Sequence, residues 1–310
     1  MNFFCKKIIV WVAGAWVIIT GLSPAAEGRH QALQSYLRDI TLSGDKIVNG
    51  GTLLLEIDTR NFTTPVTDLR IRFQEATFPA YEHPFKPQGF YFGLVGIPLR
   101  SEPGQTILTL EWAEADGRHT QTVPFCIVAA SYRIDKLTVD SRKVNLNKKD
   151  LTRVTREKQE IKRIYANGSG ARLWHGRFRL PVKSDVTSPF GNKRMFNGQL
   201  KSFHNGVDFR AQVGKPVYAS NKGIVRLAKN LFFSGNIVMI DHGTGVFTNY
   251  AHLSKIDVIP DQHIEKGQQI GLSGATGRVN GPHLHWGIKV TDTYVDPLQF
   301  VDVIALLSGD

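Results

Sequence analysis

Apolar and polar positions alternate with a period of two along much of residues 30–140. The pattern is clearest in three segments, at residues 53–57, 108–112 and 123–127. In the first segment, three apolar residues share one face, while Glu56 takes the other. This alternation is typical of strands with one buried face, and turn signals rather than helical stretches separate the segments. We therefore expect a β-sandwich-like accessory domain over residues 27–142.

A different pattern begins at Asn147. Apolar residues recur at roughly helical spacing at Leu151, Val154, Ile161 and Ile164. Charged residues fill the positions between them, and Gly168-Ser169-Gly170 ends the pattern. The spacing predicts a helix of about 15 residues. We interpret it as part of a helical linker over residues 143–172.

Residues 173–310 consist largely of short apolar runs that are separated by glycines. The runs 237–240 and 269–272 are examples, and no long helical pattern fits this region. We expect an all-β C-terminal domain with many tight turns. The fold class predicted for the whole chain is therefore mainly β, in the order β-sandwich-like domain, helical connector and C-terminal β-domain.

The first 26 residues have the pattern of an export signal. Lys6 and Lys7 precede an uncharged apolar run at 8–22, and small residues follow at 23–26. The run is shorter than the roughly 20 residues that a membrane span needs, so we predict a signal peptide over residues 1–26 that is cleaved. A retained anchor is the alternative. After cleavage no stable membrane span is expected, and the protein would reside in the periplasm or cell envelope.

The formal net charge of +11 favours anionic partners. Nucleic acid is excluded as the expected partner, because the chain has no zinc finger and no aromatic RNP strand. An acidic polymer of the cell envelope fits the charge better, and simple solubility is the plain alternative.

Six of the ten histidines lie between positions 204 and 285. On a strand, His283 and His285 would point to one side and Leu284 and Trp286 to the other. The apolar side would anchor the strand in the core and present both imidazoles together on the open side. One of them could bind a metal ion while its neighbour faces a substrate.

His204 and Asp208 flank Asn205-Gly206, a tight-turn dipeptide that can bring both side chains toward one ion. A catalytic zinc site has three protein ligands and an open position for water, and two histidines with one aspartate meet that count. His252 is a candidate for a contact behind the ligands or for proton transfer. In the alternative of a closed structural site, the fourth ligand would be His242 or His263.

These fragments resemble the lysostaphin/LytM-type zinc metallopeptidases, a family of exported bacterial peptidoglycan endopeptidases. The matching motifs are His-x-x-x-Asp at 204–208, Tyr-x-His-Leu at 250–253 and His-x-His at 283–285. The resemblance covers about residues 175–300. It implies a compact antiparallel β-domain that hydrolyses peptidoglycan cross-links or stem peptides.

The resemblance also implies roles for five residues. His204, Asp208 and His285 would bind one Zn²⁺ ion per chain, and His252 and His283 would be the catalytic histidines. Members of the family that lack some of these positions act as non-enzymatic activators of another wall hydrolase. That function is the alternative here, although all five positions are present. The accessory domain would shield the site, target the wall or bind an envelope protein partner.

Overall fold

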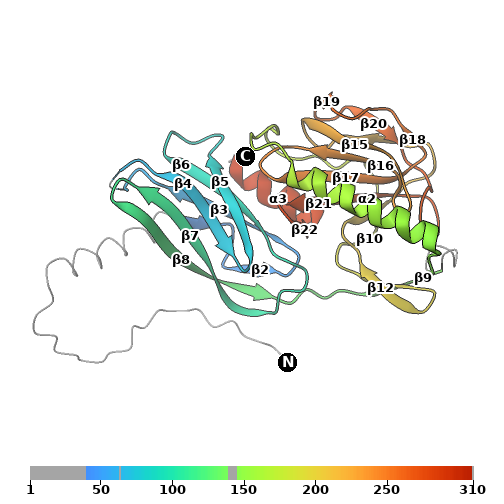
Figure 1. Ribbon diagram of the computed structural model, residues 1–310, viewed down its shortest axis with the longest axis horizontal. Helices are drawn as coiled ribbons and strands as arrows, with labels where there is room; N and C mark the ends of the chain where they lie inside the picture. Colours follow the sequence, from blue (N-terminus) through green and yellow to red (C-terminus); the bar gives the residue numbers. More distant parts are fainter. Residues whose placement is uncertain (1–39, 63, 139–144, 309–310) are drawn as a thin grey trace, which may run out of the picture.

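The computed structural model describes residues 40–62, 64–138 and 145–308 (Figure 1). The signal peptide predicted over residues 1–26 lies outside the described residues. Within them the chain is mainly β, as the sequence predicted, and it contains two helices. Figure 1 shows two β-rich parts side by side, with helix α3 at their junction.

The first part is an eight-stranded sheet in the order β1-β3-β6-β5-β4-β7-β8-β2. Its strands are β1 Ile40–Leu42, β2 Lys46–Val48, β3 Thr52–Asp58, β4 Thr67–Phe73, β5 Ala76–Glu82, β6 Phe90–Gly96, β7 Gly104–Glu114 and β8 Gly117–Val128. The alternating residues of β7 and β8 are buried as predicted, and they face β3 and β6 across one apolar core. The sandwich-like arrangement is therefore confirmed.

The opposite face of β3 and β6 is apolar as well. Leu54, Phe92 and Leu94 are buried there, and they belong to the core of the C-terminal part rather than to that of the sandwich. The ring of Phe92 lies 6.0 Å from the ring of Trp174, centroid to centroid. The two parts of the chain therefore share a hydrophobic core.

Helix α2 spans Lys148–Ala166, and its 19 residues exceed the predicted length. Asn147 caps its N-terminus by accepting a hydrogen bond from the backbone N–H of Asp150 at 2.9 Å. On its buried side, Ile161, Ile164 and Tyr165 pack against a cluster on β15, β16 and β17. The connector is therefore part of the C-terminal structure, and the boundaries of the linker stay predictions.

The C-terminal part is built on a second eight-stranded sheet in the order β10-β13-β21-β17-β16-β15-β19, with β22 beside β21. Its strands are β10 Val186–Ser188, β13 Val207–Arg210, β15 Gly223–Leu231, β16 Gly235–Asp241, β17 Val246–Leu253, β19 His263–Ile264, β21 His283–Val290 and β22 Thr293–Val295. The connected strands within this sheet pair antiparallel. One face covers the main core, and α2 covers part of the other.

Two three-stranded sheets flank the central one, in the orders β12-β11-β9 and β14-β20-β18. Their strands are β9 Ile134–Leu137, β11 Lys193–Phe196, β12 Gln199–Phe203, β14 Pro216–Tyr218, β18 Lys255–Ile256 and β20 Gln269–Leu272. Strand β9 pairs parallel with β11, so the segment between the sandwich and α2 adds a strand to the β11–β12 hairpin.

Helix α3, Pro297–Ser308, corrects the expectation that residues 173–310 contain no long helix. Its buried residues are Phe300, Val303, Ile304 and Leu307, which have the spacing of one helical face. Exposed Leu306 and other apolar residues between them blur that spacing in the sequence. Asp296 caps the helix by accepting from the backbone N–H of Leu298 at 2.9 Å.

Helix α3 also ties the two parts together. The side-chain amide of Gln299 accepts from the backbone N–H of Thr52 at 2.8 Å and donates to its carbonyl at 2.9 Å. The backbone N–H of Asp296 donates to the carbonyl of Gly50 at 2.7 Å. No helix in the described part of the chain is long and apolar enough to cross a membrane.

Because the core is shared, we expect the two parts to unfold together. Phe92→Ala should lower the free energy of unfolding by about 3–5 kcal/mol, the usual cost of removing a buried phenylalanine ring. Phe85→Ala is the matched control, since Phe85 is 55% exposed and its loss should cost less than about 0.5 kcal/mol. Denaturant unfolding followed by tryptophan fluorescence and by circular dichroism measures both. Two separate transitions, with only the first shifted by Phe92→Ala, would contradict the shared core.

Candidate metal centre

Strand β21 presents two histidines on its open face. Leu284 and Trp286 are fully buried in the main core, and His283 and His285 point the other way. The geometry predicted for this segment is therefore confirmed. Asp208 on β13 is the direct cross-strand partner of His285, so the strand pairing itself brings their side chains together.

The Asn205-Gly206 turn brings His204 to the same place. His204 follows β12 directly and is 1% exposed. Gly206 passes so close to β21 that a Cβ atom there would lie 2.8 Å from Cε1 of His285. A side chain at this position would push the turn away from the strand, so the glycine is needed for close approach.

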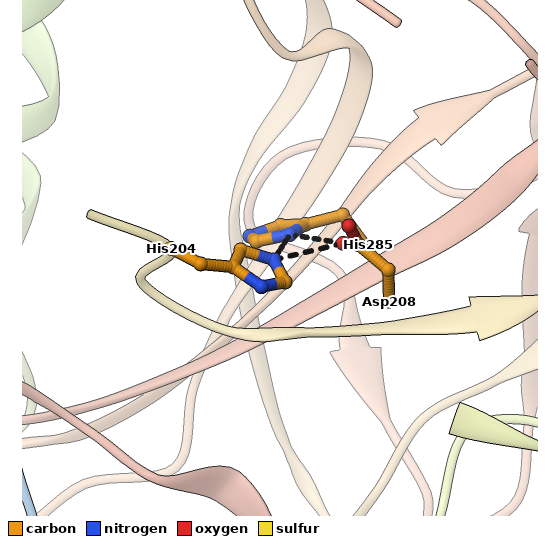
Figure 2. A group of neighbouring side chains, drawn as sticks. All are labelled: His204, Asp208 and His285. Atoms are coloured by element: carbon orange, nitrogen blue, oxygen red, sulfur yellow. Dashed lines mark hydrogen bonds and ion pairs between the residues drawn. The ribbon is translucent and has the colours of Figure 1, made fainter. Parts of the chain in front are cut away.

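His204, Asp208 and His285 form a compact cluster (Figure 2). Asp208 Oδ1 lies 2.9 Å from His204 Nε2 and 2.8 Å from His285 Nδ1, and the two ring nitrogens are 3.0 Å apart. Among the residues that the structure describes, it is the one group of three or more His, Cys, Asp or Glu side chains with ligand atoms this close together.

The donor set of the cluster fits a divalent cation. His204 Nδ1 lies 2.8 Å from the carbonyl of Pro189 and 3.2 Å from Ser188 Oγ, so Nδ1 carries the proton of the neutral ring. Its Nε2 lone pair then faces a carboxylate oxygen of Asp208, another acceptor. Two acceptors at this distance repel each other unless a proton or a cation lies between them. Two imidazoles and a carboxylate are also the ligands that zinc prefers in catalytic sites.

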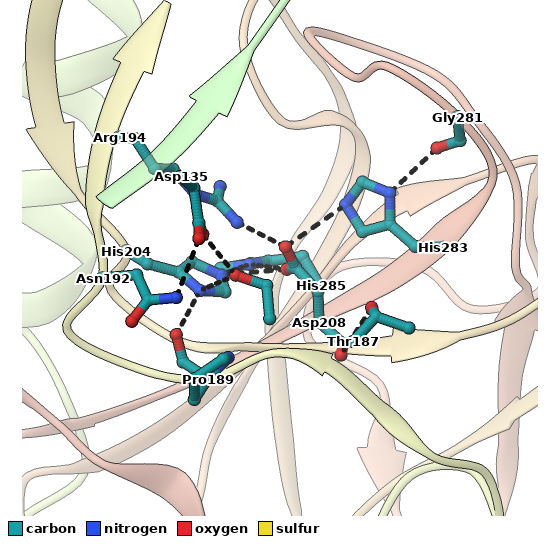
Figure 3. Close-up of polar contacts among 11 residues, drawn as sticks. Asp135, Thr187, Pro189, Asn192, Arg194, His204, Asp208, Gly281, His283 and His285 are labelled. Atoms are coloured by element: carbon teal, nitrogen blue, oxygen red, sulfur yellow. Dashed lines mark hydrogen bonds and ion pairs between the residues drawn. The ribbon is translucent and has the colours of Figure 1, made fainter. Parts of the chain in front are cut away.

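A chain of hydrogen bonds holds His204 at Nδ1, the ring nitrogen that faces away from Asp208 (Figure 3). Ser188 Oγ donates to Asp135 Oδ2 at 2.8 Å, and the side-chain amide of Asn192 donates to Asp135 Oδ1 at 3.0 Å. Asp135 belongs to β9, about 70 residues before His204 in the sequence. Sequence reasoning missed this residue, because a single aspartate in a short strand carries no signal of its partner.

The two oxygens of Asp208 face different groups. Oδ1 faces the cluster, while Oδ2 accepts a hydrogen bond from Arg194 and lies 3.8 Å from His283 Nε2. Burial alone would raise the pKa of Asp208, but the neighbouring His204 and His285 outweigh it and hold that pKa well below its ordinary value. The carboxylate therefore stays ionised, as a ligand must. Arg194 was also missed by sequence reasoning.

His252 reaches the cluster through an irregularity in β17. Strict alternation would point it to the core side with Tyr250, yet its ring centroid lies 4.8 Å from that of His283. Between Asn236 and Val238 the register with β16 shifts, and β17 carries one extra residue there. The backbone of His252 has φ of 64°, a conformation that non-glycine residues rarely adopt. This bulge turns the imidazole toward the open face.

Hydrogen bonds to carbonyl groups fix the tautomers of the second histidine pair. His252 Nδ1 donates to the carbonyl of Thr276 at 2.8 Å, and His283 Nδ1 donates to that of Gly281 at 2.9 Å. Each neutral ring therefore keeps a basic lone pair on Nε2. Burial, and then the nearby His283 and His285, lower the pKa of His252 well below its ordinary value.

The two other histidines weighed as ligands lie outside the cluster. His242 is fully buried, with Nδ1 donating to the carbonyl of Lys222 at 2.7 Å and Nε2 2.8 Å from the hydroxyl of Thr248. His263 lies on the edge strand β19 and is exposed. Neither belongs to the group of close ligand atoms among the described residues, so the geometry gives no support to a closed four-ligand site.

A cleft of about 540 Å³ opens beside the cluster. Asp208 of the cluster and His283 of the second histidine pair line it, so each group has one residue beside space that a substrate can enter. A carboxylate of a three-ligand cluster and a histidine beside it at a cleft wall are an arrangement suited to metal-assisted hydrolysis.

The sequence matches the model of peptidase family M23 over residues 202–297. Peptidoglycan DD-endopeptidase ShyA of Vibrio cholerae serotype O1 is 41% identical over 138 residues, which are 44% of this chain and 32% of ShyA. An uncharacterized metalloprotease of Haemophilus influenzae is 34% identical over 199 residues, 61% of this chain and 41% of that protein. The chain thus spans less than half the length of these two curated relatives.

A solved structure extends the similarity to most of the chain. It is a crystal structure from Pseudomonas aeruginosa that carries the name peptidase M23. The two share 30% sequence identity with a TM-score of 0.62, over 83% of this chain and 95% of that one. With the residue 202–297 match, this similarity shows that the chain belongs to peptidase family M23.

Proposed function

We propose that the protein is a zinc-dependent endopeptidase that hydrolyses peptide bonds in the cross-links or stem peptides of peptidoglycan. The observation that carries the proposal is the cluster of His204, Asp208 and His285 beside His252 and His283, at the edge of an open cleft. A relative named peptidoglycan DD-endopeptidase supports the substrate class. The formal charge of +11 suits an anionic wall polymer.

His204 Nε2, Asp208 Oδ1 and His285 Nδ1 would hold one zinc ion. A zinc ion in such a site supplies a Lewis acid that makes water nucleophilic at neutral pH and polarises the scissile carbonyl. The hydrogen bond that His204 Nδ1 donates to the Pro189 carbonyl and the one that Arg194 donates to Asp208 Oδ2 would fix the direction in which the ligand atoms face.

His252 and His283 would move the protons. Each ring has its Nδ1 proton held by a carbonyl, so Nε2 of either ring can accept the proton of the attacking water. The protonated ring can then return it to the leaving amine. Burial keeps His252 neutral at neutral pH, which a proton acceptor requires.

Export to the periplasm or cell envelope follows from the substrate, because peptidoglycan lies outside the cytoplasm. The signal segment at residues 1–26 and the domain divisions 27–142, 143–172 and 173–310 are part of the proposal. The shared core implies that the accessory domain supports the fold of the peptidase part, beyond any contact with the wall or with an envelope partner.

Metal removal tests the proposal directly. The purified protein should release peptides from cell-wall sacculi, and a zinc chelator should abolish the release until zinc is added back. His285→Ala should lose both activity and bound zinc, because two ligands hold the ion poorly. His263→Ala, an exposed histidine outside the cluster, is the control and should keep both. Undiminished turnover by the chelated protein would exclude the proposed chemistry.

Substitution of the second histidine pair separates proton transfer from metal binding. His252→Gln and His283→Gln should each lower kcat by about 10²–10⁴-fold, the usual contribution of a general acid–base group. Both variants should keep one zinc ion per chain in elemental analysis. If the protein instead stimulates a partner amidase and both variants do so equally well, the non-enzymatic activator function would be correct.

A further inference from the structure

Two arginines line the cleft beside the metal cluster. Arg194 comes from β11, and Arg278 comes from the loop 273–282 between β20 and β21. The motifs that carry the family resemblance include neither residue, and the roles proposed above use Arg194 only as a contact of Asp208. Together the two guanidinium groups give one wall of the cleft a local positive charge.

Arg194 is held against the cluster by its bond to Asp208 Oδ2 (Figure 3). Its side chain is 16% exposed, and its Nε atom is buried without a hydrogen-bond partner among the described residues. A guanidinium group has five N–H donors, so the contact with Asp208 leaves further donors at the edge of the cleft.

Arg278 is fixed by aromatic rings. Its Cζ atom lies 4.1 Å from the ring centroid of Phe196 and 4.2 Å from that of Phe233. Its backbone N–H donates to the carbonyl of Phe233 at 2.8 Å. Burial, and then the charge of Arg194, lower the pKa of Arg278 to about 10, so the group stays charged at neutral pH. A planar cation held in this way is preorganised for a planar anion.

The carboxylates of the cleft wall already serve other groups. Asp135 accepts from Ser188 and Asn192, and Asp208 faces the cluster and Arg194. Lys136 adds a third cation to the lining, which makes the wall positive even before a metal ion is counted. An anion that enters the cleft would meet cations whose side chains are already held in place.

We propose that Arg194 and Arg278 form a subsite for a carboxylate of the peptide substrate, next to the scissile bond. This inference rests on the proposed function and names the feature by which the site selects its substrate. Guanidinium groups bind carboxylates through paired, charge-assisted hydrogen bonds, which fix the orientation of the bound peptide as well as its affinity. The carboxylate would come either from a chain terminus or from a side chain of the cross-linked peptide.

The test uses the full-length protein loaded with zinc and a soluble cross-linked peptide dimer in three forms. One form has all carboxylates free, the second has its terminal carboxylates converted to amides, and the third has its side-chain carboxylates converted. We expect one of the two amides to lower kcat/KM of the wild type by about 10- to 100-fold, and the one that does so identifies the source. Arg278 is substituted rather than Arg194, because Arg194 contacts a proposed metal ligand.

Arg278→Gln should cleave the free acid and the amide that the wild type cleaves slowly at equal rates, within about twofold. It should also retain the zinc content of the wild type. Arg278→Lys keeps the charge and should keep part of the discrimination. Arg179→Gln is the matched control, because Arg179 also stacks on an aromatic ring, that of Tyr218, but does not line the cleft. This variant should keep the full wild-type preference for the free acid over the amide.

Three results would overturn the subsite, and they differ from failure of the proposed function. Equal cleavage of all three substrates by the wild type would exclude carboxylate recognition while leaving the peptidase intact. Undiminished discrimination by Arg278→Gln would assign the recognition elsewhere. If Arg278→Gln does not fold, full discrimination by Arg278→Lys would overturn the paired contact between the guanidinium group and the carboxylate. Cleavage of none of the substrates would exclude the peptidase together with its subsite.

Discussion

The pairing of β13 with β21 is the constraint on which the site depends. It sets Asp208 opposite His285, and the apolar residues on the other side of both strands lie in the main core. A shift of β13 by one residue in this register would turn Asp208 toward the core and expose Phe209. The hydrophobic effect therefore fixes the positions of the polar groups, although none of the buried apolar residues takes part in the chemistry. The Asn205-Gly206 turn completes the cluster by returning His204 to the same face.

The accessory sandwich packs directly against the C-terminal part that carries the site. Leu54, Phe92 and Leu94 extend the main core beyond the peptidase part, and the amide of Gln299 closes the junction with two backbone hydrogen bonds. Strand β9 follows the sandwich in the chain and pairs with β11. It thereby places Asp135 next to Ser188, which contacts His204. The part of the chain before α2 thus contributes apolar packing beside the C-terminal sheet and hydrogen-bond partners for the groups that contact His204.

Much of this arrangement could be predicted from the sequence, because alternation and turn dipeptides act locally. They located the strands of the sandwich, helix α2 and the orientation of His283 and His285. The pattern did not predict helix α3, because the apolar residues of this helix do not leave a clear polar face. The position of His252 depends on a bulge and on a left-handed backbone conformation. Neither can be predicted from the pattern of residue types. Asp135 and Arg194 reach the site through strand pairing between distant segments, so their roles depend on tertiary structure alone.

In the proposed mechanism, His204, Asp208 and His285 hold one catalytic zinc ion. Anomalous X-ray diffraction at the zinc absorption edge, from crystals of the protein purified with zinc present, would locate that ion. We expect one anomalous peak per chain, next to His204 Nε2, an oxygen of Asp208 and His285 Nδ1, with space toward the cleft on its remaining side. A peak at other residues, or none at this cluster, would contradict the proposed mechanism.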